Sequence, residues 1–209
     1  MTAGPPLATY VIIGLNVAVF LLAPVLLGGD GWQYYLALWP DATAIEIASY
    51  IDVGNEWYRW VTSGFTHFGL LHIGMNMLAL WQMGQVLEPA LGRWRYLGLY
   101  AGSLLGSSLA VELLGTGGDL VPVAGASGAI FGLIAAYGII LKRLRLPYTQ
   151  VLVIAAIFIG GPLLSAIIPG FGFFSGLSWQ GHLGGAVVGA VIMLAMFRGV
   201  DKRERASHL

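Results

Sequence analysis

The 209-residue sequence contains no cysteine and few charged residues. The absence of cysteine excludes disulfide bonds, thiolate metal sites and a cysteine nucleophile, but it does not identify the compartment. Asp, Glu, Lys and Arg make up only 10% of the chain, whereas an average soluble domain has about 25%. The formal net charge is zero, so no basic surface favours nucleic acid as a partner. With 57% hydrophobic residues, the chain is expected to be a membrane protein.

Six apolar segments stand out, each near the roughly 20 residues that cross about 30 Å of hydrocarbon. They cover residues 7–27, 68–87, 96–114, 127–141, 149–168 and 181–197. Helices are expected for all six, because backbone exposed to lipid must satisfy its own hydrogen bonds. The sequence therefore predicts an all-α, polytopic membrane protein. We expect a single domain over residues 1–209, in which six transmembrane helices form a compact bundle with a long outer loop at residues 28–67.

The distribution of charge predicts the orientation. Nine of the ten Lys and Arg residues lie after the second and fourth segments or after the last one. The other three loops hold seven of the ten Asp and Glu residues and a single basic residue, Arg59. Cytoplasmic loops of membrane proteins are enriched in Lys and Arg, so both termini are expected to be cytoplasmic.

Polar residues recur at one depth in three of the segments. His72, Ser127 and His182 lie 15 or 16 residues before the first charged residue at the inner end of their segments. Each is therefore about 22–24 Å from the inner boundary and roughly 6–8 Å below the outer surface. Asn76 follows His72 by four residues and shares its helix face, one turn deeper. Any one of them alone fits an interhelical hydrogen bond, but together they favour a site that faces a cavity.

The fourth segment is too short to span a membrane. From Ser127 it has only 15 residues, or about 22 Å of helix. Pro122 and Gly125 precede it and disfavour a continuing helix, so irregular chain is expected to dip into the membrane beside protein or a cavity. Ser127 would then begin a recessed helix, whose free N–H groups favour an anion, as in an oxyanion hole.

Glycines spaced four residues apart predict a close approach of the fourth and sixth segments. They are Gly128 and Gly132 in one, and Gly181, Gly185 and Gly189 in the other. Small residues at this spacing let helix backbones come together, although the pattern is also common in ordinary membrane packing. Here the approach would bring Ser127 and His182 within hydrogen-bond reach.

Three stretches carry a resemblance to a known family: EWYRWVTSGFTHFGLLHIGMNM (56–77), GASGAIFG (125–132) and GHLGGAVVGA (181–190). In this order they resemble the rhomboid intramembrane serine proteases over nearly the whole chain. The resemblance implies a serine endopeptidase of the bacterial type, in its minimal six-helix form. It also implies location in the inner (plasma) membrane, with the active site facing the periplasmic or extracellular side.

The resemblance implies roles for individual residues. Ser127 would be the nucleophile and His182 the general base. His72, Asn76 and the Ser127 N–H would bind the oxyanion. No cofactor and no metal are implied, and the expected partners are single-pass transmembrane protein substrates and the lipid bilayer, not nucleic acid.

Further positions are expected to support the site. Gly125, Gly128 and Gly185 would act through close approach, and the resemblance implies that Phe131 packs on the His182 ring and that His67, Glu56 and Arg59 have structural roles.

A serine–histidine dyad is expected instead of a triad, since no Asp or Glu lies at the depth of His182. Loss of the acid member slows a soluble triad protease by about 10⁴-fold, so turnover is expected to be slow. Water must reach Ser127 through a cavity open to the outer face. Access would be controlled by the fifth segment, where Pro162 favours a kink, or by the loop at residues 170–178, which equally fits an interfacial aromatic belt.

Other function classes fit the sequence less well. The alternative is a catalytically inactive rhomboid-like protein that binds or escorts membrane clients; such relatives lack the serine or the histidine, and both are present here. A transporter or channel is disfavoured because no Asp, Glu, Lys or Arg lies mid-membrane and no inverted repeat appears. An α/β-hydrolase elbow is excluded because Ala129 replaces the last glycine of GxSxG and no strand precedes it.

Overall fold

The structure is a computed structural model that describes residues 4–29, 31–39, 57–115, 122–168 and 176–206, with side chains to residue 198. Its long helices are α1 (Leu7–Leu27), α5 (Leu70–Leu91), α6 (Arg93–Leu114), α7 (Ser127–Arg143) and α10 (Trp179–Ala206). Within the described residues the regular structure is helical apart from one isolated bridge, between Leu38 and Val123. The prediction of an all-α protein is confirmed for this part of the chain.

Shorter helices occupy two further regions. In the predicted outer loop lie α2 (Trp32–Leu36), α4 (Arg59–Thr62) and the 3₁₀ turn η1 (Ser63–Phe65). The fifth predicted segment is divided into α8 (Thr149–Ala155), a π-helical turn η2 (Ala156–Gly160) and α9 (Gly161–Ile167). The division coincides with Pro162, whose ring cannot supply a helical N–H.

Four helices in the described residues are long and apolar enough to cross a membrane: Leu7–Leu27, Arg93–Leu114, Thr149–Ile167 and Trp179–Arg198. The helix α7 has 17 residues, or about 26 Å, and α5 carries His72, Asn76 and Glu88 among its apolar residues. The helix α7 is therefore shorter than a typical spanning helix, and α5 is less apolar than one.

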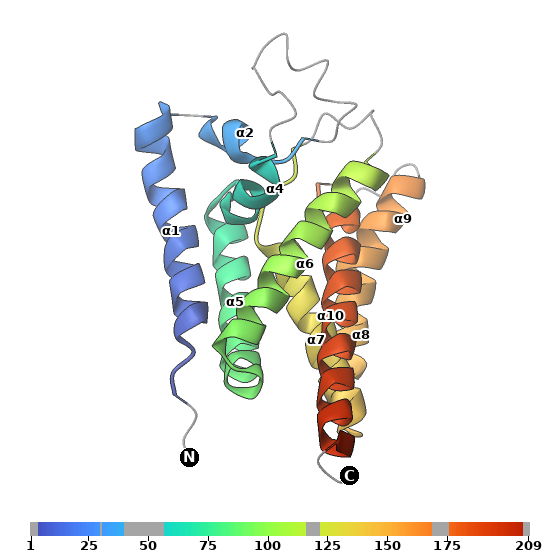
Figure 1. The fold of residues 1–209 in the computed structure, drawn as a ribbon. Coiled ribbons are helices and arrows are strands. Elements are labelled where there is room, and N and C mark those ends of the chain that lie inside the picture. The colour runs from blue at the N-terminus through green and yellow to red at the C-terminus, as the bar shows by residue number, and fades with distance from the viewer. Residues whose placement is uncertain (1–3, 30, 40–56, 116–121, 169–175, 207–209) are drawn as a thin grey trace.

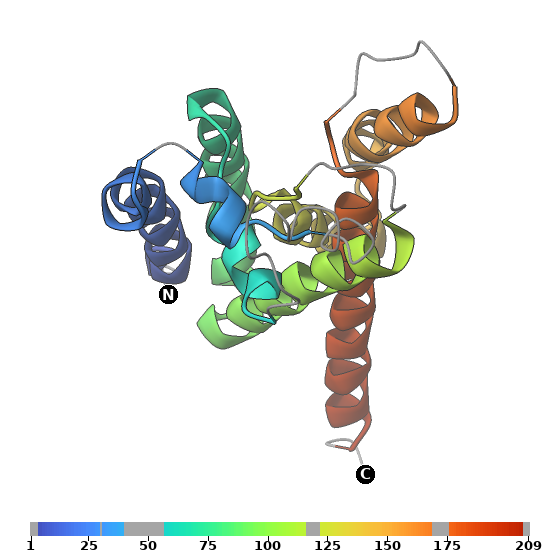
Figure 2. The ribbon, with the colours of Figure 1, turned by 90° about the horizontal axis from the view of Figure 1, so that it is seen from above.

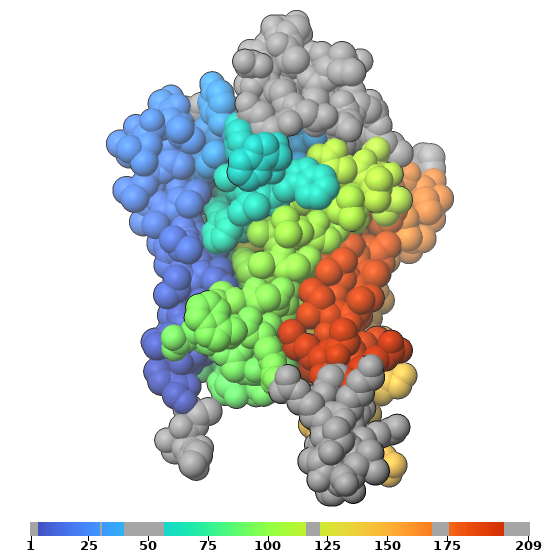
Figure 3. Space-filling model, viewed as in Figure 1, coloured from blue at the N-terminus to red at the C-terminus, as the bar shows by residue number. Residues whose placement is uncertain are grey.

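The most deeply buried helix is α7. Nine of its 17 residues are buried, whereas none is buried in α8 or η2. Seen from above, α7 lies between α5, α6 and α10 (Figure 2). The helices α6 and α10 pack closely against each other and against α7, and their outer surfaces lie side by side on one face of the molecule (Figure 3). This burial holds the start of α7 in a fixed position.

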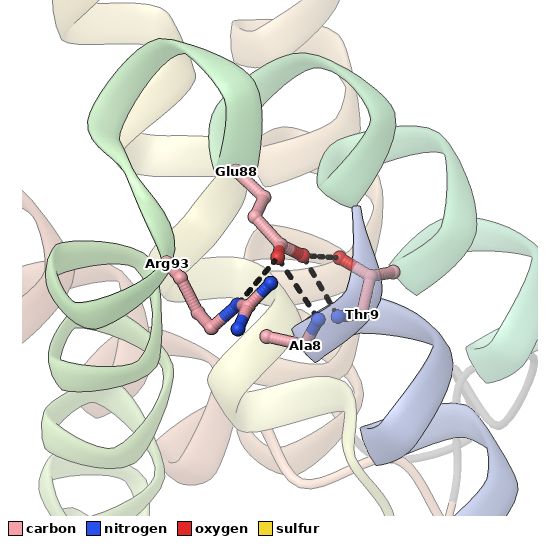
Figure 4. Close-up of polar contacts among 4 residues, drawn as sticks. All are labelled: Ala8, Thr9, Glu88 and Arg93. Atoms are coloured by element: carbon pink, nitrogen blue, oxygen red, sulfur yellow. Dashed lines mark hydrogen bonds and ion pairs between the residues drawn. The ribbon is translucent and has the colours of Figure 1, made fainter. Parts of the chain in front are cut away.

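The helix α1 is fastened to α5 by Glu88. Its carboxylate accepts hydrogen bonds from the Ala8 N–H at 2.9 Å, the Thr9 N–H at 2.8 Å and the Thr9 hydroxyl at 2.8 Å. Arg93 lies 4.0 Å from the same carboxylate (Figure 4). Because these partners satisfy the charge of Glu88, α5 continues past residue 87, where the sequence predicts its end, to Leu91.

The helix α10 also continues beyond its predicted end at residue 197, to Ala206. Lys, Arg and Glu have good helix propensity, so the charged sequence after Arg198 favours continuation of the helix. The described end of α10 and the start of α1 lie at the same end of the molecule (Figure 1).

Candidate active site

Ser127 is the first residue of α7. The chain that leads to it, residues 122–126, is irregular, in agreement with the sequence-based expectation. This chain is held in place by backbone hydrogen bonds that sequence reasoning did not find. Leu38 and Val123 exchange N–H···O bonds of 2.8 and 2.9 Å, and the Gly125 N–H donates to the Ser63 carbonyl at 2.9 Å. The outer segment therefore positions Ser127.

His182 lies in the first turn of α10 and is buried. The start of this turn is defined by Ser178, whose hydroxyl accepts a 3.1 Å hydrogen bond from the Gly181 N–H, as an N-cap residue does. His182 Nε2 lies 3.0 Å from the Ser127 hydroxyl oxygen. The two side chains predicted to meet are thus hydrogen-bonded across α7 and α10.

The second ring nitrogen of His182 contacts a backbone group. Nδ1 lies 2.8 Å from the carbonyl oxygen of Phe158, in η2. A carbonyl can only accept, so Nδ1 carries the proton of a neutral ring and Nε2 is left as the acceptor. The Ser127 hydroxyl therefore donates to Nε2, which is the arrangement a general base requires.

Phe131 fixes the plane of the imidazole. Its ring stacks on that of His182 with the centroids 4.4 Å apart and the planes inclined by 21°. Phe131 lies one turn after Ser127 on α7, as the sequence-based expectation had it. The base is thereby held by an aromatic face on one side and hydrogen bonds at both nitrogens.

The close approach of α7 and α10 depends on glycine. A Cβ atom on Gly185 would meet the Gly128 carbonyl, and one on Gly189 would meet the Gly132 backbone. A Cβ on Gly128 would meet the Ser107 side chain of α6 and would also lie 3.3 Å from the Gly181 carbonyl oxygen. Any larger residue would separate the helices and, with them, Ser127 and His182.

A small space beside Gly125 is bounded by Ser127 and His72. Gly125 has a φ of +120°, and a Cβ atom on it would lie 2.7 Å from His72 Nε2 and 3.7 Å from the Ser127 hydroxyl oxygen. His72 Nδ1 accepts a long hydrogen bond of 3.5 Å from the Phe68 N–H, so Nε2 is the nitrogen left to donate. Glycine keeps this space open between a hydroxyl and an N–H donor.

Asn76 lies one turn below His72 on α5 and is buried. Its side-chain amide donates to the His72 carbonyl at 2.9 Å. Since an amide nitrogen has two protons, this bond orients the group and leaves a second proton for another acceptor. The structure thus brings Asn76 and His72 together on one wall, as the helical spacing predicts.

The remaining predicted positions differ in what they contact. His67 is fully buried, edge-on to the His72 ring at 4.9 Å, and burial together with the charge of His72 lowers the pKa of His67 to about 4. Arg59 is buried and donates to the carbonyls of Tyr34 and Ala37 at 2.8 and 3.1 Å. It therefore ties α4 to the α2 region. Glu56 lies outside the described residues, as does much of the loop at 170–178.

A cavity of about 1650 Å³ is lined by Ser127, His182, His72 and Asn76. It also extends between α5 and the α8–α9 segment, where its lining is mainly apolar, and Gln82, Gln150 and Ser165 are among its polar residues there. Ligand pockets for small molecules have volumes of about 300–1,000 Å³, so this one is large enough for a length of polypeptide.

Within the described residues, no cluster of three or more His, Asp or Glu side chains is arranged to hold a metal ion. The polar groups that line the cavity include the Ser127 hydroxyl, the imidazoles of His72 and His182 and the Asn76 amide. Such groups can transfer a proton and stabilise a negative oxygen.

The family model of the Rhomboid domain matches residues 54–199, which is more than half of the chain and includes every residue of this site. The chain belongs to the rhomboid family. The resemblance seen in the three sequence stretches is thereby confirmed, and a multi-pass membrane protein is what the family and the apolar helices support.

Several curated proteins are similar to this rhomboid. "Rhomboid protease GluP" of Bacillus subtilis (strain 168) is 32% identical over 192 residues, 89% of this chain and 34% of that protein. "Rhomboid protease GlpG" of Serratia proteamaculans (strain 568) is 33% identical over 130 residues, 62% and 38% of the two chains. "Rhomboid protein 1, mitochondrial" of Saccharomyces cerevisiae is 26% identical over 218 residues, 96% and 56%. This chain spans between about a third and somewhat more than half of their lengths.

Proposed function

We propose that this rhomboid is an intramembrane serine endopeptidase in which Ser127 is the nucleophile and His182 the general base. The observation that carries the proposal is the 3.0 Å hydrogen bond from the Ser127 hydroxyl to His182 Nε2, in a cavity of the described residues. The names of the relatives, which are rhomboid proteases, support the same reaction.

In the first half of the reaction, the Ser127 oxygen attacks the carbonyl carbon of the scissile peptide bond. His182 Nε2 takes the hydroxyl proton and then delivers it to the nitrogen of the leaving amine as the C–N bond breaks. The product is an ester between Ser127 and the N-terminal part of the substrate. In the second half, His182 takes a proton from water, the hydroxide attacks this ester, and the proton returns to Ser127.

The oxyanion that forms in each half would lie in the small space beside Gly125. The proposed donors are the Ser127 N–H at the start of α7, His72 Nε2–H beside Gly125, and the second amide proton of Asn76. The first N–H groups of a helix have no intrahelical acceptor and carry the positive end of its dipole. Preorganised donors of this kind stabilise the developing charge without reorganisation.

The substrate is proposed to be a single-pass transmembrane protein, unwound near its outer membrane boundary. A helix conceals its peptide bonds, whereas an extended segment fits along a cavity that runs between α5 and α8–α9. In this proposal six helical passes cross the inner membrane, both termini are cytoplasmic, and Ser127 opens to the periplasmic or extracellular side.

The test is cleavage of a single-pass reporter substrate by the purified protein in liposomes. The wild type is expected to cleave it, and Ser127→Ala and His182→Ala are each expected to lower turnover by at least about 10³-fold, because nucleophile and base act as a unit. A serine-reactive phosphonate is expected to label the wild type at Ser127.

Ser165→Ala is the matched control, since Ser165 lines the same cavity and its hydroxyl donates only along its own helix, to Gly161. It should retain turnover. If the wild type leaves several substrates intact and takes no label at Ser127, the protein is not a protease, and a client-binding role follows instead.

A further inference from the structure

The carbonyl of Phe158 is the orienting partner of the candidate base. It lies in η2, on a different helix from His182, and contacts Nδ1 at 2.8 Å. In serine–histidine–aspartate sites a carboxylate occupies this position and holds the imidazole in the reactive tautomer. No described Asp or Glu contacts His182 here, so a neutral backbone group has the place of the acid.

The availability of this carbonyl has a local cause. In a regular α-helix the Phe158 carbonyl would accept from the N–H of residue 162, but residue 162 is proline. A helical proline has no N–H, and its ring also displaces the carbonyl four residues before it. The helix adjusts with a π turn, in which the Gly161 N–H bonds to the Ala156 carbonyl.

Phe158 is also linked to His182 through its side chain. The Phe158 ring lies 6.1 Å from that of Phe131, which itself stacks on His182. No residue of α8 or η2 is buried, and in α9 only Gly161 and Pro162 are. The two buried residues of the α8–α9 segment thus directly follow η2, and in α8 Val151 and Ile154 pack against the core while only partly buried.

From these contacts we infer that the Phe158 backbone carbonyl, freed by Pro162, is a positioning group that holds His182 in the reactive tautomer. The inference rests on the proposed protease function. Its consequence is that movement of α8–α9 away from α10 removes the acceptor from Nδ1. The helix that borders the substrate cavity thus sets the orientation of the base.

The direct test weakens this one carbonyl by replacing the amide between Phe158 and Ile159 with an ester, using the hydroxy-acid analogue of isoleucine. An ester carbonyl is the poorer acceptor. We expect kcat to fall about threefold to tenfold, the range of one weakened hydrogen bond, with KM unchanged. In ¹⁵N-histidine-labelled protein, the Nδ1–H signal of His182 should shift and the other tautomer should appear.

The matched control is the same analogue at Ile167, at the end of α9, which makes the Ala166 carbonyl an ester instead. It uses the same residue type in the same α8–α9 segment but leaves the Phe158 carbonyl and the π turn unchanged, so kcat and the His182 signal should stay near those of the wild type. Equal kcat values and an identical His182 signal in the two esters would overturn the inference.

A second variant, Pro162→Ala, restores an N–H that competes for the Phe158 carbonyl. It should lower kcat and shift the His182 signal in the same direction as the ester, whereas Pro24→Ala in α1 should do neither. The ¹⁵N signals report whether His182 Nδ1–H is bonded to the Phe158 carbonyl, even if the wild type cleaves nothing. Failure of the proposed function is thus separable from failure of this inference.

Discussion

At the scale of single residues, the site is defined by which hydrogen-bonding groups are already engaged. His182 uses both nitrogens, His72 uses Nδ1, and Asn76 uses one amide proton on its own helix. His72 Nε2–H and the second Asn76 amide proton remain as donors, and the Asn76 amide oxygen also has no hydrogen-bond partner among the described residues. An amide can donate to a negatively charged oxygen but is too weak a base to take the serine proton, which is why Asn76 is assigned to the oxyanion and not to the base.

Asn76→Ala is expected to lower turnover about 10²–10³-fold, the usual cost of removing one oxyanion donor. The thermal unfolding midpoint should change little, because the lost hydrogen bond is local to α5. Initial rates on the reporter substrate give the measurement. Gln82→Ala removes another cavity-lining amide from the same helix and should keep most of the activity; full activity of Asn76→Ala would remove Asn76 from the proposed oxyanion site.

At the scale of helices, the least buried long helix depends on a polar fastening. Few residues of α1 are buried, and its first N–H groups need acceptors outside the helix. The Glu88 carboxylate supplies two of them and binds the Thr9 hydroxyl as well. A negative charge at a helix N-terminus also interacts favourably with the helix dipole.

Glu88→Ala is therefore expected to destabilise the protein by about 2–4 kcal/mol, since it removes three hydrogen bonds to a charged acceptor. The readouts are the thermal unfolding midpoint in detergent and the rate of proteolysis within α1. Glu88→Gln keeps the side-chain length and one acceptor oxygen, so its loss should be smaller. A midpoint for Glu88→Ala equal to that of the wild type would show that α1 is held by apolar contacts alone.

At the scale of the whole molecule, the end where basic residues gather is opposite to the end of α7 that lines the cavity. Arg93 begins α6, and Lys142 and Arg143 end α7. The α5–α6 and α7–α8 connections lie at the end of the molecule where α1 begins and α10 ends (Figure 1). Positive residues thus gather at one end, and the cavity end of α7 points the other way. By the positive-inside rule this basic end is the one that we propose to be cytoplasmic.

An epitope inserted within residues 142–147 is expected to be reached by antibody only after the cytoplasmic side is opened. An epitope placed after Gly29 should be reached from the opposite side without opening the membrane. The measurement is labelling of intact cells or right-side-out vesicles before and after permeabilisation. Exposure of the 142–147 epitope on intact cells would reverse the proposed orientation.

The sequence by itself determined the helical class, the start of α7 at Ser127 and the side chains that meet in the cavity. These features depend on hydropathy over a window of residues, on proline and glycine, and on helical spacing, all of which are local. The pairing of Ser127 with His182 could be inferred because glycine spacing indicates where two helices come close.

Only the tertiary structure decided which backbone groups complete the site. The carbonyl of Phe158 at His182, that of Ser63 at Gly125 and the exchange between Leu38 and Val123 join segments distant in sequence. Every residue has a carbonyl and nearly every one has an N–H, so the amino-acid sequence does not indicate which of these backbone groups will pair. Pro162 was the one local signal. From the sequence it predicted a kink, and the folded structure shows that it leaves the Phe158 carbonyl available as an acceptor.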